Sequence, residues 1–202
     1  MFFTASDLDQ LYKPPSDAIV KGVMPRLLPF HTAYLRVARF FCLATGSSDG
    51  LDASPRGGEP GFVHALDEKT VAFADWPGNN RIASLRNLTD DDRVGMLFLF
   101  PGLEVFMRIN GRGSISTDPA LLASLAEGAR SPKTAVVVRL DEVLFHCGKA
   151  INRAKLWSED AKLDRPSVPS LGEMKAAQTG DVPAKARAMD DAYYHSVRNS
   201  LY

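Results

Sequence analysis

The chain has few of the residues that mark a disulfide-stabilised, metal-binding or nucleic-acid-binding protein. Its 202 residues include two cysteines, Cys42 and Cys147, each in an apolar strand-like run, so we expect buried, reduced thiols. The four histidines lack the spacing of metal ligands, which predicts no metal site. Lysine plus arginine and aspartate plus glutamate both total 24, and this balance argues against general nucleic-acid binding through a basic surface.

Long apolar runs are also missing. No run approaches the length of a membrane span. The first ten residues, MFFTASDLDQ, carry acids where a signal peptide has basic residues followed by an apolar stretch. We therefore expect a cytoplasmic protein that does not contact a membrane.

The apolar pattern predicts a mainly β fold. Runs rich in β-branched and aromatic residues are separated by short turns, and Asp49-Gly50 predicts a hairpin turn. Such runs occupy residues 39–45, 61–66, 70–75, 93–100, 104–115 and 134–146. We expect about five to seven strands in a small closed or split β-barrel with flanking helices.

The run at residues 104–115 alternates between apolar and polar positions. Val105, Met107, Ile109 and Ile115 share the face that we expect to be buried, and the polar residues share the other. Two glycines, at 111 and 113, fall on the apolar face, where they predict a bend or bulge.

We expect one domain over residues 1–202, with a barrel core at about 37–150 and a helical extension at about 151–202. A helix near the amino end has Ser6 or Asp7 as its expected cap, and Asp118 should cap a second helix. Beyond Ala150, prolines at 166, 169 and 183 divide the chain into short helices and loops. This extension is either a solvated tail packed on the barrel or a segment that clasps a partner.

The stretch DWPGNNRIASLRNL, residues 75–88, predicts a strand that turns into a short helix. Asn79 or Asn80 is the expected cap, and Arg81 should lie in the first helical turn. A helix amino terminus carries partial positive charge and favours an anion over a guanidinium. Either Arg81 is simply solvated, or an anion such as phosphate lies between the arginine and the free backbone amides.

Two other stretches combine polar side chains with tight turns. In DASPRGGEPG, Ser54 and Arg56 precede a glycine pair, a pattern that suits either turn geometry or a second phosphate contact. In HCGKAINRAKLW, Lys149, Arg153 and Trp157 recur every four residues and would share one face of a helix. No nucleophile, base and orienting group occur at a recognisable spacing. Any chemistry is therefore expected to come from a bound cofactor.

These segments, in this order, resemble the pyridoxamine 5'-phosphate oxidase-like flavoproteins of the FMN-binding split-barrel superfamily. The resemblance rests on SPRGG, FADWPGNNRIASLRNL, VGMLFLFPGLEVFMRINGRGSI and EVLFHCGKAINRAKLW, and it extends from Phe40 to Trp157. It implies a split β-barrel that dimerises and holds FMN in two symmetric clefts at the subunit interface.

The resemblance also implies a set of cofactor contacts, while the catalytic residues stay unassigned. One group would meet the phosphate and ribityl chain: Ser54, Pro55 and Arg56. A second group would lie along the flavin or on the phosphate: Ala74, Asp75, Trp76, Asn79, Asn80 and Arg81. The segment Glu104–Arg108, with Arg108 as a cofactor contact, would reach the flavin from the partner subunit. Lys149, Arg153 and Trp157 would close the ring end of the cleft, from a subunit that the sequence does not identify.

The resemblance favours an FMN-dependent oxidoreductase that transfers hydride at flavin N5. The expected partners are a second copy of the chain and a small-molecule substrate or NAD(P)H, and FAD stays an alternative cofactor. Other candidate functions are a non-catalytic protein that stores or senses FMN or haem, and a dimeric scaffold with an empty cleft. Members that oxidise pyridoxamine 5'-phosphate end in a basic Arg-Leu-x-Pro segment, whereas this chain ends in HSVRNSLY. We therefore do not expect the vitamin B6 reaction.

Overall fold

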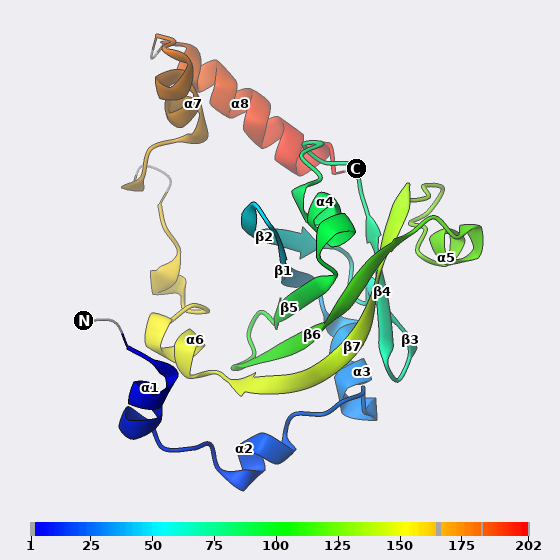
Figure 1. Cartoon of the computed structure of the whole chain (residues 1–202). Coiled ribbons are helices and arrows are strands. Elements are labelled where there is room, and N and C mark those ends of the chain that lie inside the picture. Colours follow the sequence, from blue (N-terminus) through cyan, green and yellow to red (C-terminus); the bar gives the residue numbers. More distant parts are fainter. Residues whose placement is uncertain (1–2, 165–166, 183, 202) are drawn as a thin grey trace. The chain divides into compact units, whose positions relative to one another are not determined.

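In the computed structural model the expected strands form one antiparallel sheet (Figure 1). Its order is β2-β1-β5-β6-β7-β4-β3. The seven strands are β1 (Phe40–Ser47), β2 (Gly50–Gly57), β3 (Val63–Asp67), β4 (Thr70–Asp75), β5 (Arg93–Leu99), β6 (Val105–Ser116) and β7 (Thr134–Cys147). Within the described chain the two edge strands, β2 and β3, do not pair with each other. The prediction of a mainly β, split barrel is confirmed.

The structure describes residues 3–164, 167–182 and 184–201. The chain divides into two compact units, Met1–Ala150 and Ile151–Tyr202, and each is described by itself. Pro166 and Pro183, which we expected to interrupt helices, lie outside the described residues. A single domain over the whole chain stays a prediction.

Local geometry explains how the strands turn and bend. The β1–β2 hairpin pairs Ser47 with Gly50, and Gly50 has a φ of 135°, which confirms the expected hairpin. The register of β6 and β7 shifts between Asn110 and Gly111, which confirms the expected bulge. A Cβ atom at Gly111 would lie 2.2 Å from the carbonyl oxygen of Arg139, so only glycine fits this close approach.

The core lies between the inward faces of the strands. The largest fully buried side chains include Phe41, Phe73, Phe98, Met96, Met107 and Ile109. Full burial of side chains of this size stabilises a fold by about 1.5–3 kcal/mol each. The expected burial of Ile115 is wrong, because this residue, one position before the end of β6, is 36% exposed.

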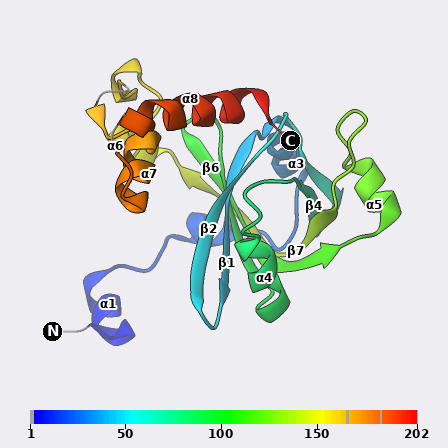
Figure 2. The same ribbon diagram turned by 90° about the horizontal axis from the view of Figure 1, so that it is seen from above.

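Helices add to this core from two sides. Helix α3 (Pro29–Val37) contributes the buried Leu35, and helix α4 (Ala83–Asp90) contributes Leu88. A Cβ atom at Gly113 would lie 2.9 Å from the Leu88 side chain, so this glycine lets α4 pack closely on β6. Figure 2 shows α4 beside β1, to which the Asn87 amide is joined by a hydrogen bond of 3.0 Å to the Thr45 hydroxyl.

The remaining helices of the first unit are short. They are α1 (Ala5–Leu11), α2 (Asp17–Lys21) and α5 (Pro119–Ser124). Asp118 caps α5 as expected, by accepting a hydrogen bond of 2.8 Å from the Leu121 amide. The expected cap of α1 at Ser6 or Asp7 is wrong. Thr4 is the cap, and Asp7 completes a capping box from the third helical position.

The second unit is a pair of packed helices, α7 (Leu171–Thr179) and α8 (Ala184–Asn199), preceded by the single turn Glu159–Ala161. A Cβ atom at Gly172 would lie 2.0 Å from the carbonyl oxygen of Ala186, so the two helices meet closely there. The Asp190 carboxylate accepts a hydrogen bond of 2.8 Å from the Gly172 amide. None of the helices in the described ranges has the length and apolar character needed to cross a membrane.

The two thiols are less buried than expected. Cys42 on β1 is half-buried, and Cys147 at the end of β7 is exposed. Both are free. The sequence pattern fails here because Cys42 faces the outer side of β1, in one row with Pro55 and Leu97, whereas Cys147 is the last residue of β7, where burial ends.

His31 is a buried polar residue with a structural role. It is 1% exposed, its ring stacks on Phe145 with the centroids 5.3 Å apart, and its Nδ1 atom accepts a hydrogen bond of 2.9 Å from the Leu28 amide. Burial lowers the pKa of His31 below its ordinary value. The neutral imidazole therefore stabilises the start of α3.

This arrangement predicts a pH-dependent stability. The unfolded chain takes up a proton on His31 near its ordinary pKa of about 6.5, whereas the folded chain resists protonation until a lower pH. The stabilisation is therefore complete above the unfolded pKa and is lost as the pH falls below it. We expect His31→Gln to reduce the difference in unfolding free energy between about pH 7.5 and about pH 5.5, measured by urea denaturation. An unchanged difference, matching that of the exposed-site control His195→Gln, would contradict this role.

Candidate functional site

The loop between β4 and α4 differs from its predicted geometry. The helix begins at Ala83, and its N-cap residue is Ile82, so Arg81 precedes the helix instead of lying in its first turn. Neither Asn79 nor Asn80 caps the helix. The Asn79 side-chain oxygen instead accepts a hydrogen bond of 3.0 Å from the Arg81 amide.

The backbone of this loop is strained at its junction with the helix. Ile82 has a φ of 44° and Asn80 a φ of 59°. A β-branched residue in the left-handed region is a conformational outlier, and such strain is typical of functional loops. No side-chain hydrogen bond caps α4, so the amides of its first turn are available to an anion.

Strand β2 presents three polar side chains to this loop and helix. Asp52, Ser54 and Arg56 alternate along β2 and are each partly buried, while Pro55 is exposed on the other side of the strand. They pair with Thr45, Leu43 and Phe41 of β1, so they share the inward face of the sheet. Because β2 is an edge strand, it tolerates a proline.

A hydrogen-bond network joins β2 to the first turn of α4. Atom Oδ2 of Asp52 accepts hydrogen bonds from the hydroxyls of Ser54 at 2.8 Å and Ser84 at 2.6 Å. Atom Nη2 of Arg56 donates to the Ser84 hydroxyl at 3.2 Å, and Nη1 donates to the Pro55 carbonyl at 2.9 Å. The guanidinium of Arg56 is thus held beside the uncapped end of α4.

The two carboxyl groups of this cluster have pKa values shifted in opposite directions. The hydrogen bond from Ser84 is the main cause that lowers the pKa of Asp52, with smaller contributions from Ser54, Arg56 and Arg81. Burial raises the pKa of Asp75, and the charge of Arg56 partly opposes this. The charge of Arg56 therefore acts on both acids, one on β2 and one at the end of β4.

The other predicted residues of the β4 end lie near this cluster. Asp75 follows the buried Val71 and Phe73 on the inward face of β4, whereas Ala74 packs against a small apolar cluster on the opposite face. Trp76 is half-buried just beyond the strand. A Cβ atom at Gly78 would meet no protein atom within 4 Å, so the space beside this glycine is open.

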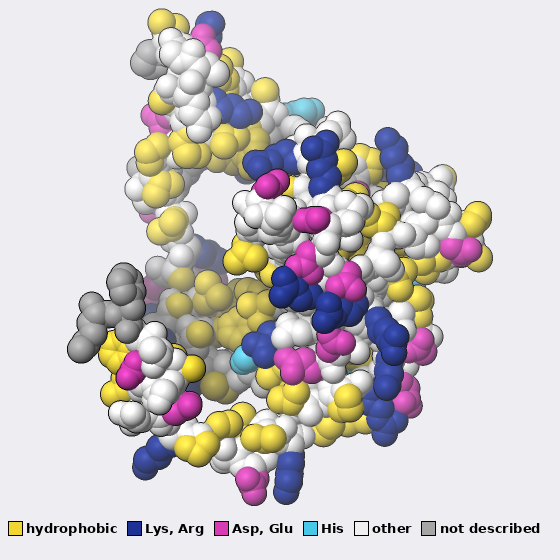
Figure 3. Space-filling model, viewed as in Figure 1, with side chains coloured by type: hydrophobic (Ala, Val, Ile, Leu, Met, Phe, Trp, Pro, Cys, Tyr) yellow, Lys and Arg dark blue, Asp and Glu magenta, His cyan; other side chains and the backbone are white. Residues whose placement is uncertain are grey.

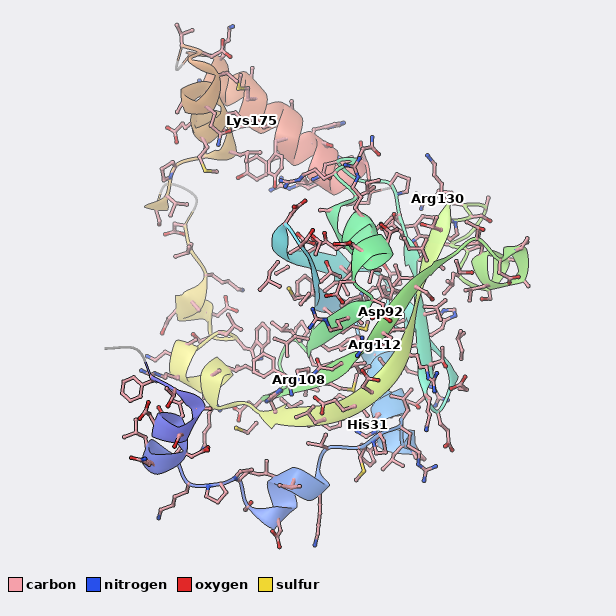
Figure 4. All side chains as sticks on the ribbon, in the orientation of Figure 1. His31, Asp92, Arg108, Arg112, Arg130 and Lys175 are labelled. Carbon is pink, nitrogen blue, oxygen red and sulfur yellow. The ribbon has the colours of Figure 1, made fainter. Side chains whose placement is uncertain are left out.

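Arg108 lies on a different face of the sheet from Arg56. It is paired with Leu97 of β5 and Leu144 of β7, and the same row continues through Cys42 to Pro55, on the side of the sheet opposite Arg56. Figure 4 shows Arg108 on β6. Within one chain, Arg108 therefore does not join the cluster at α4.

The surroundings of Arg108 are polar and only partly satisfied. Its Nη2 atom donates to Glu142 at 3.3 Å, and the Asn110 amide donates to the same oxygen at 2.8 Å. The Nε atom of Arg108 is buried and has no hydrogen-bond partner. Burial, and to a lesser extent the charge of Arg108, lowers the pKa of the nearby His146.

The third group of predicted site residues, Lys149, Arg153 and Trp157, does not lie on a single helix. Lys149 and Arg153 lie on helix α6 (Lys149–Ala154) and are exposed. Trp157 is half-buried but lies beyond the helix, because Lys155 has a φ of 50° and ends it. The expectation that all three share one helical face is wrong. The boundary between the two units falls within α6, so only Lys149 belongs to the barrel unit.

Two residues of the cluster were missed by sequence analysis. Asp52 could have been found, because it precedes Ser54 by two positions and a strand places such residues on one face. Ser84 could not, because the expected helix start was too early. Among the described residues, no group of three or more His, Cys, Asp or Glu side chains could hold a metal ion.

Comparisons with known proteins identify the family. Residues 27–147, well over half of the chain, match the model of the family described as pyridoxamine 5'-phosphate oxidase. No curated protein matches the chain.

Among solved structures, HupZ from Group A Streptococcus is similar, with 19% identity, coverage of 58% of this chain and 92% of that chain, and a TM-score of 0.47. An FMN-binding protein from Syntrophomonas wolfei subsp. wolfei has 11% identity, coverage of 56% and 82%, and a TM-score of 0.44. These likenesses say nothing about the ligand or activity of this chain. Because the family match covers more than half of its residues, the chain belongs to the pyridoxamine 5'-phosphate oxidase family.

Proposed function

We propose that this protein binds FMN and is an FMN-dependent oxidoreductase. The observation that carries the proposal is the convergence of Arg56 and Arg81, from two separate elements, on the uncapped amino end of α4. A phosphate group suits this arrangement, because helix amides and planar guanidinium donors both stabilise a dianion. Together with the Asp52 carboxylate, the two arginines leave one net positive charge.

The residues present fit the phosphate end of a flavin nucleotide. Two of the five N–H groups of Arg56 are used by Pro55 and Ser84, which leaves three for a ligand. The left-handed φ of Ile82, at the uncapped start of α4, is backbone strain that a bound anion would offset. The proposed contacts of the flavin itself are Ala74, Asp75 and Trp76, at the end of β4.

The proposed molecule is a homodimer in which each cleft takes residues from both chains. We define the outer face as the side of the sheet that carries Arg108. Its apolar residues, all exposed or half-buried, are Phe40, Cys42, Ala44, Ala53, Pro55, Leu97, Leu99, Phe106 and Leu144. An apolar surface that crosses five strands is typical of a protein–protein interface.

The opposite placement of Arg108 and Arg56 supports this assembly. A second copy bound to the outer face would bring its own polar residues, including Arg108, to the cleft of the first copy. Within one chain, Arg108 does not reach that cleft. The unpartnered Nε atom of Arg108 would then have a ligand or a partner group to meet. The proposed roles of Lys149, Arg153 and Trp157 at the ring end also stay proposals.

When bound, the flavin supplies hydride transfer at its N5 atom, to or from a small substrate or NAD(P)H. The contribution of the chain is to hold the phosphate with Arg56 and Arg81 and to orient the ring against the end of β4. Asp75 is half-buried at the end of β4, and this burial raises its pKa above the ordinary value.

The phosphate assignment predicts a large preference for FMN over riboflavin. Riboflavin has the same ring and ribityl chain but lacks the phosphate, so it would lose the contacts to both arginines. We expect FMN to bind at least about 100-fold more tightly, in line with two charge-assisted hydrogen-bonding groups. Titration of each flavin by fluorescence quenching measures the ratio, and equal affinities would overturn the assignment.

Reduction by a nicotinamide cofactor distinguishes an oxidoreductase from a protein that stores or senses flavin. We expect NADH or NADPH, added without oxygen, to bleach the visible absorption of the bound flavin. A flavin that is retained in one-to-one amount but is reduced by neither nicotinamide, nor by any small reductant in a substrate panel, would favour the storage or sensing function.

A further inference from the structure

A buried serine links strand β2 to helix α4 through the arginine of the candidate phosphate site. Ser84 is the second residue of α4 and is 2% exposed. Its hydroxyl meets the Asp52 carboxylate at 2.6 Å and the Arg56 guanidinium at 3.2 Å. The Ser54 hydroxyl meets the same Asp52 oxygen at 2.8 Å.

The direction of each hydrogen bond follows from the groups involved. A guanidinium only donates and an ionised carboxylate only accepts, so Ser84 must accept from Arg56 and donate its single proton to Asp52. The Ser54 proton is committed to Asp52 in the same way. Neither hydroxyl is then free to donate to a phosphate, which leaves the arginines and the α4 amides as the donors.

The presence of Asp52 is unfavourable for anion binding taken alone. A carboxylate near a phosphate repels it, and this cost must be balanced if the site binds FMN. Asp52 fixes the proton of Ser84, and Ser84 then presents a lone pair that holds one edge of the Arg56 guanidinium. A long side chain that is already ordered loses less conformational entropy when the ligand binds.

We propose that Ser84, oriented by Asp52, is a positioning residue that holds Arg56 ready for the phosphate of FMN. The identity of the anion rests on the proposed function, but the ordering of Arg56 does not. The competing interpretation is that Ser84 only ties α4 to β2 and contributes to stability.

A double-mutant cycle separates these interpretations. We expect Ser84→Ala to weaken FMN binding about tenfold and to change riboflavin binding less than about twofold, because it acts only through a hydrogen bond to a charged group. In an Arg56→Ala background the same substitution should have no further effect on FMN. Ser84→Thr keeps the hydroxyl and should restore most of the affinity. An equal loss for both flavins, or the same loss without Arg56, would overturn the proposal.

A second measurement does not need the flavin. In the ligand-free protein, the 15N heteronuclear NOE of the Arg56 Nε–H group reports whether the side chain is ordered. We expect an ordered Arg56 in the wild type and a mobile one in Ser84→Ala and Asp52→Ala, with the exposed Arg86 as an unchanged control.

An Arg56 that stays equally ordered in both variants would refute the positioning role, even if FMN binds as proposed. Loss of order in these variants, in a protein that does not prefer FMN over riboflavin, would instead refute the proposed function and leave the positioning of Arg56 intact.

Discussion

Replacing Arg56 and Arg81 together by alanine is expected to abolish retention of FMN. Both guanidinium groups lie near Asp52 at the amino end of α4, and together they supply the charged donors of the site. Charge-assisted hydrogen bonds contribute about 1.5–3 kcal/mol each, so their joint loss should raise the dissociation constant by about two to four orders of magnitude. Equilibrium dialysis against FMN measures this change.

A matched control removes the same charge elsewhere. Arg86 on α4 and Arg139 on β7 are both exposed, and neither side chain is among those that contact Asp52. The double variant Arg86→Ala and Arg139→Ala should therefore keep FMN. If the Arg56 and Arg81 variant is folded and still carries flavin in one-to-one amount, the phosphate does not lie at this helix end.

A charge on the outer face is expected to dissociate the proposed dimer and to release the proposed flavin. Leu97 lies in the middle strand of this face, is 36% exposed, and stands opposite Cys42 and Arg108. Leu97→Lys leaves the ammonium solvated in a monomer but buries it beside Arg108 in a dimer. Because an unpaired buried charge costs several kcal/mol, we expect the dimer dissociation constant to rise at least about 100-fold.

Analytical ultracentrifugation measures this assembly, and flavin absorbance recorded in the same run reports retention. Leu66→Lys on β3 is the control, because Leu66 is 46% exposed and lies at the other edge of the sheet. Dissociation without loss of flavin would show that one chain holds FMN alone. A Leu97→Lys dimer as tight as the wild type would show that the outer face is not the interface.

A network of surface ion pairs borders the outer face and does not conflict with the proposed interface there. Arg112 bonds to Asp92 at 2.8 Å and lies 3.5 Å from Asp141, and Figure 4 shows Arg112 and Asp92 side by side. Figure 3 shows acidic and basic side chains intermingled across the middle of this view. Exposed pairs of this kind contribute about 0–1 kcal/mol each. Their main effect is to neutralise the positive charge of the arginines in a row on neighbouring strands, and they add little to the stability of the fold.

The sheet was predictable because apolar alternation and turn residues directly reflect strand geometry. The Asp49-Gly50 hairpin, the bulge beside Gly111 and the cap at Asp118 each depend on a few neighbouring residues, and the structure confirms all of them. The predicted cap of α1 was wrong by only a few residues, because the cap is Thr4 and not Ser6 or Asp7.

The details of the site were less predictable because they depend on local competition between hydrogen bonds. Asn79 bonds to the Arg81 amide instead of capping α4, and this delays the helix to Ala83. A left-handed Ile82 gives no signal in the sequence, since β-branched residues disfavour that conformation. Trp157 leaves its expected helix for a similar reason, at a left-handed Lys155.

The relation between Arg56 and Arg108 depends on register across four strands. No local pattern specifies that Pro55, Cys42, Leu97 and Arg108 form one row while Arg56 faces the other way. From the sequence alone, both arginines could be predicted as cofactor contacts. The sequence alone could not predict that they lie on opposite faces of the sheet within one chain.

The visible absorption spectrum of the purified protein, with chromatography of whatever heat releases, tests flavin binding most directly. We expect the absorption bands of a bound flavin and about one FMN per chain. Each chain would hold one FMN phosphate with Arg56, Arg81 and the amino terminus of α4. Release of FAD would keep the phosphate site but change the cofactor. A colourless protein that also fails to take up added FMN would contradict the account.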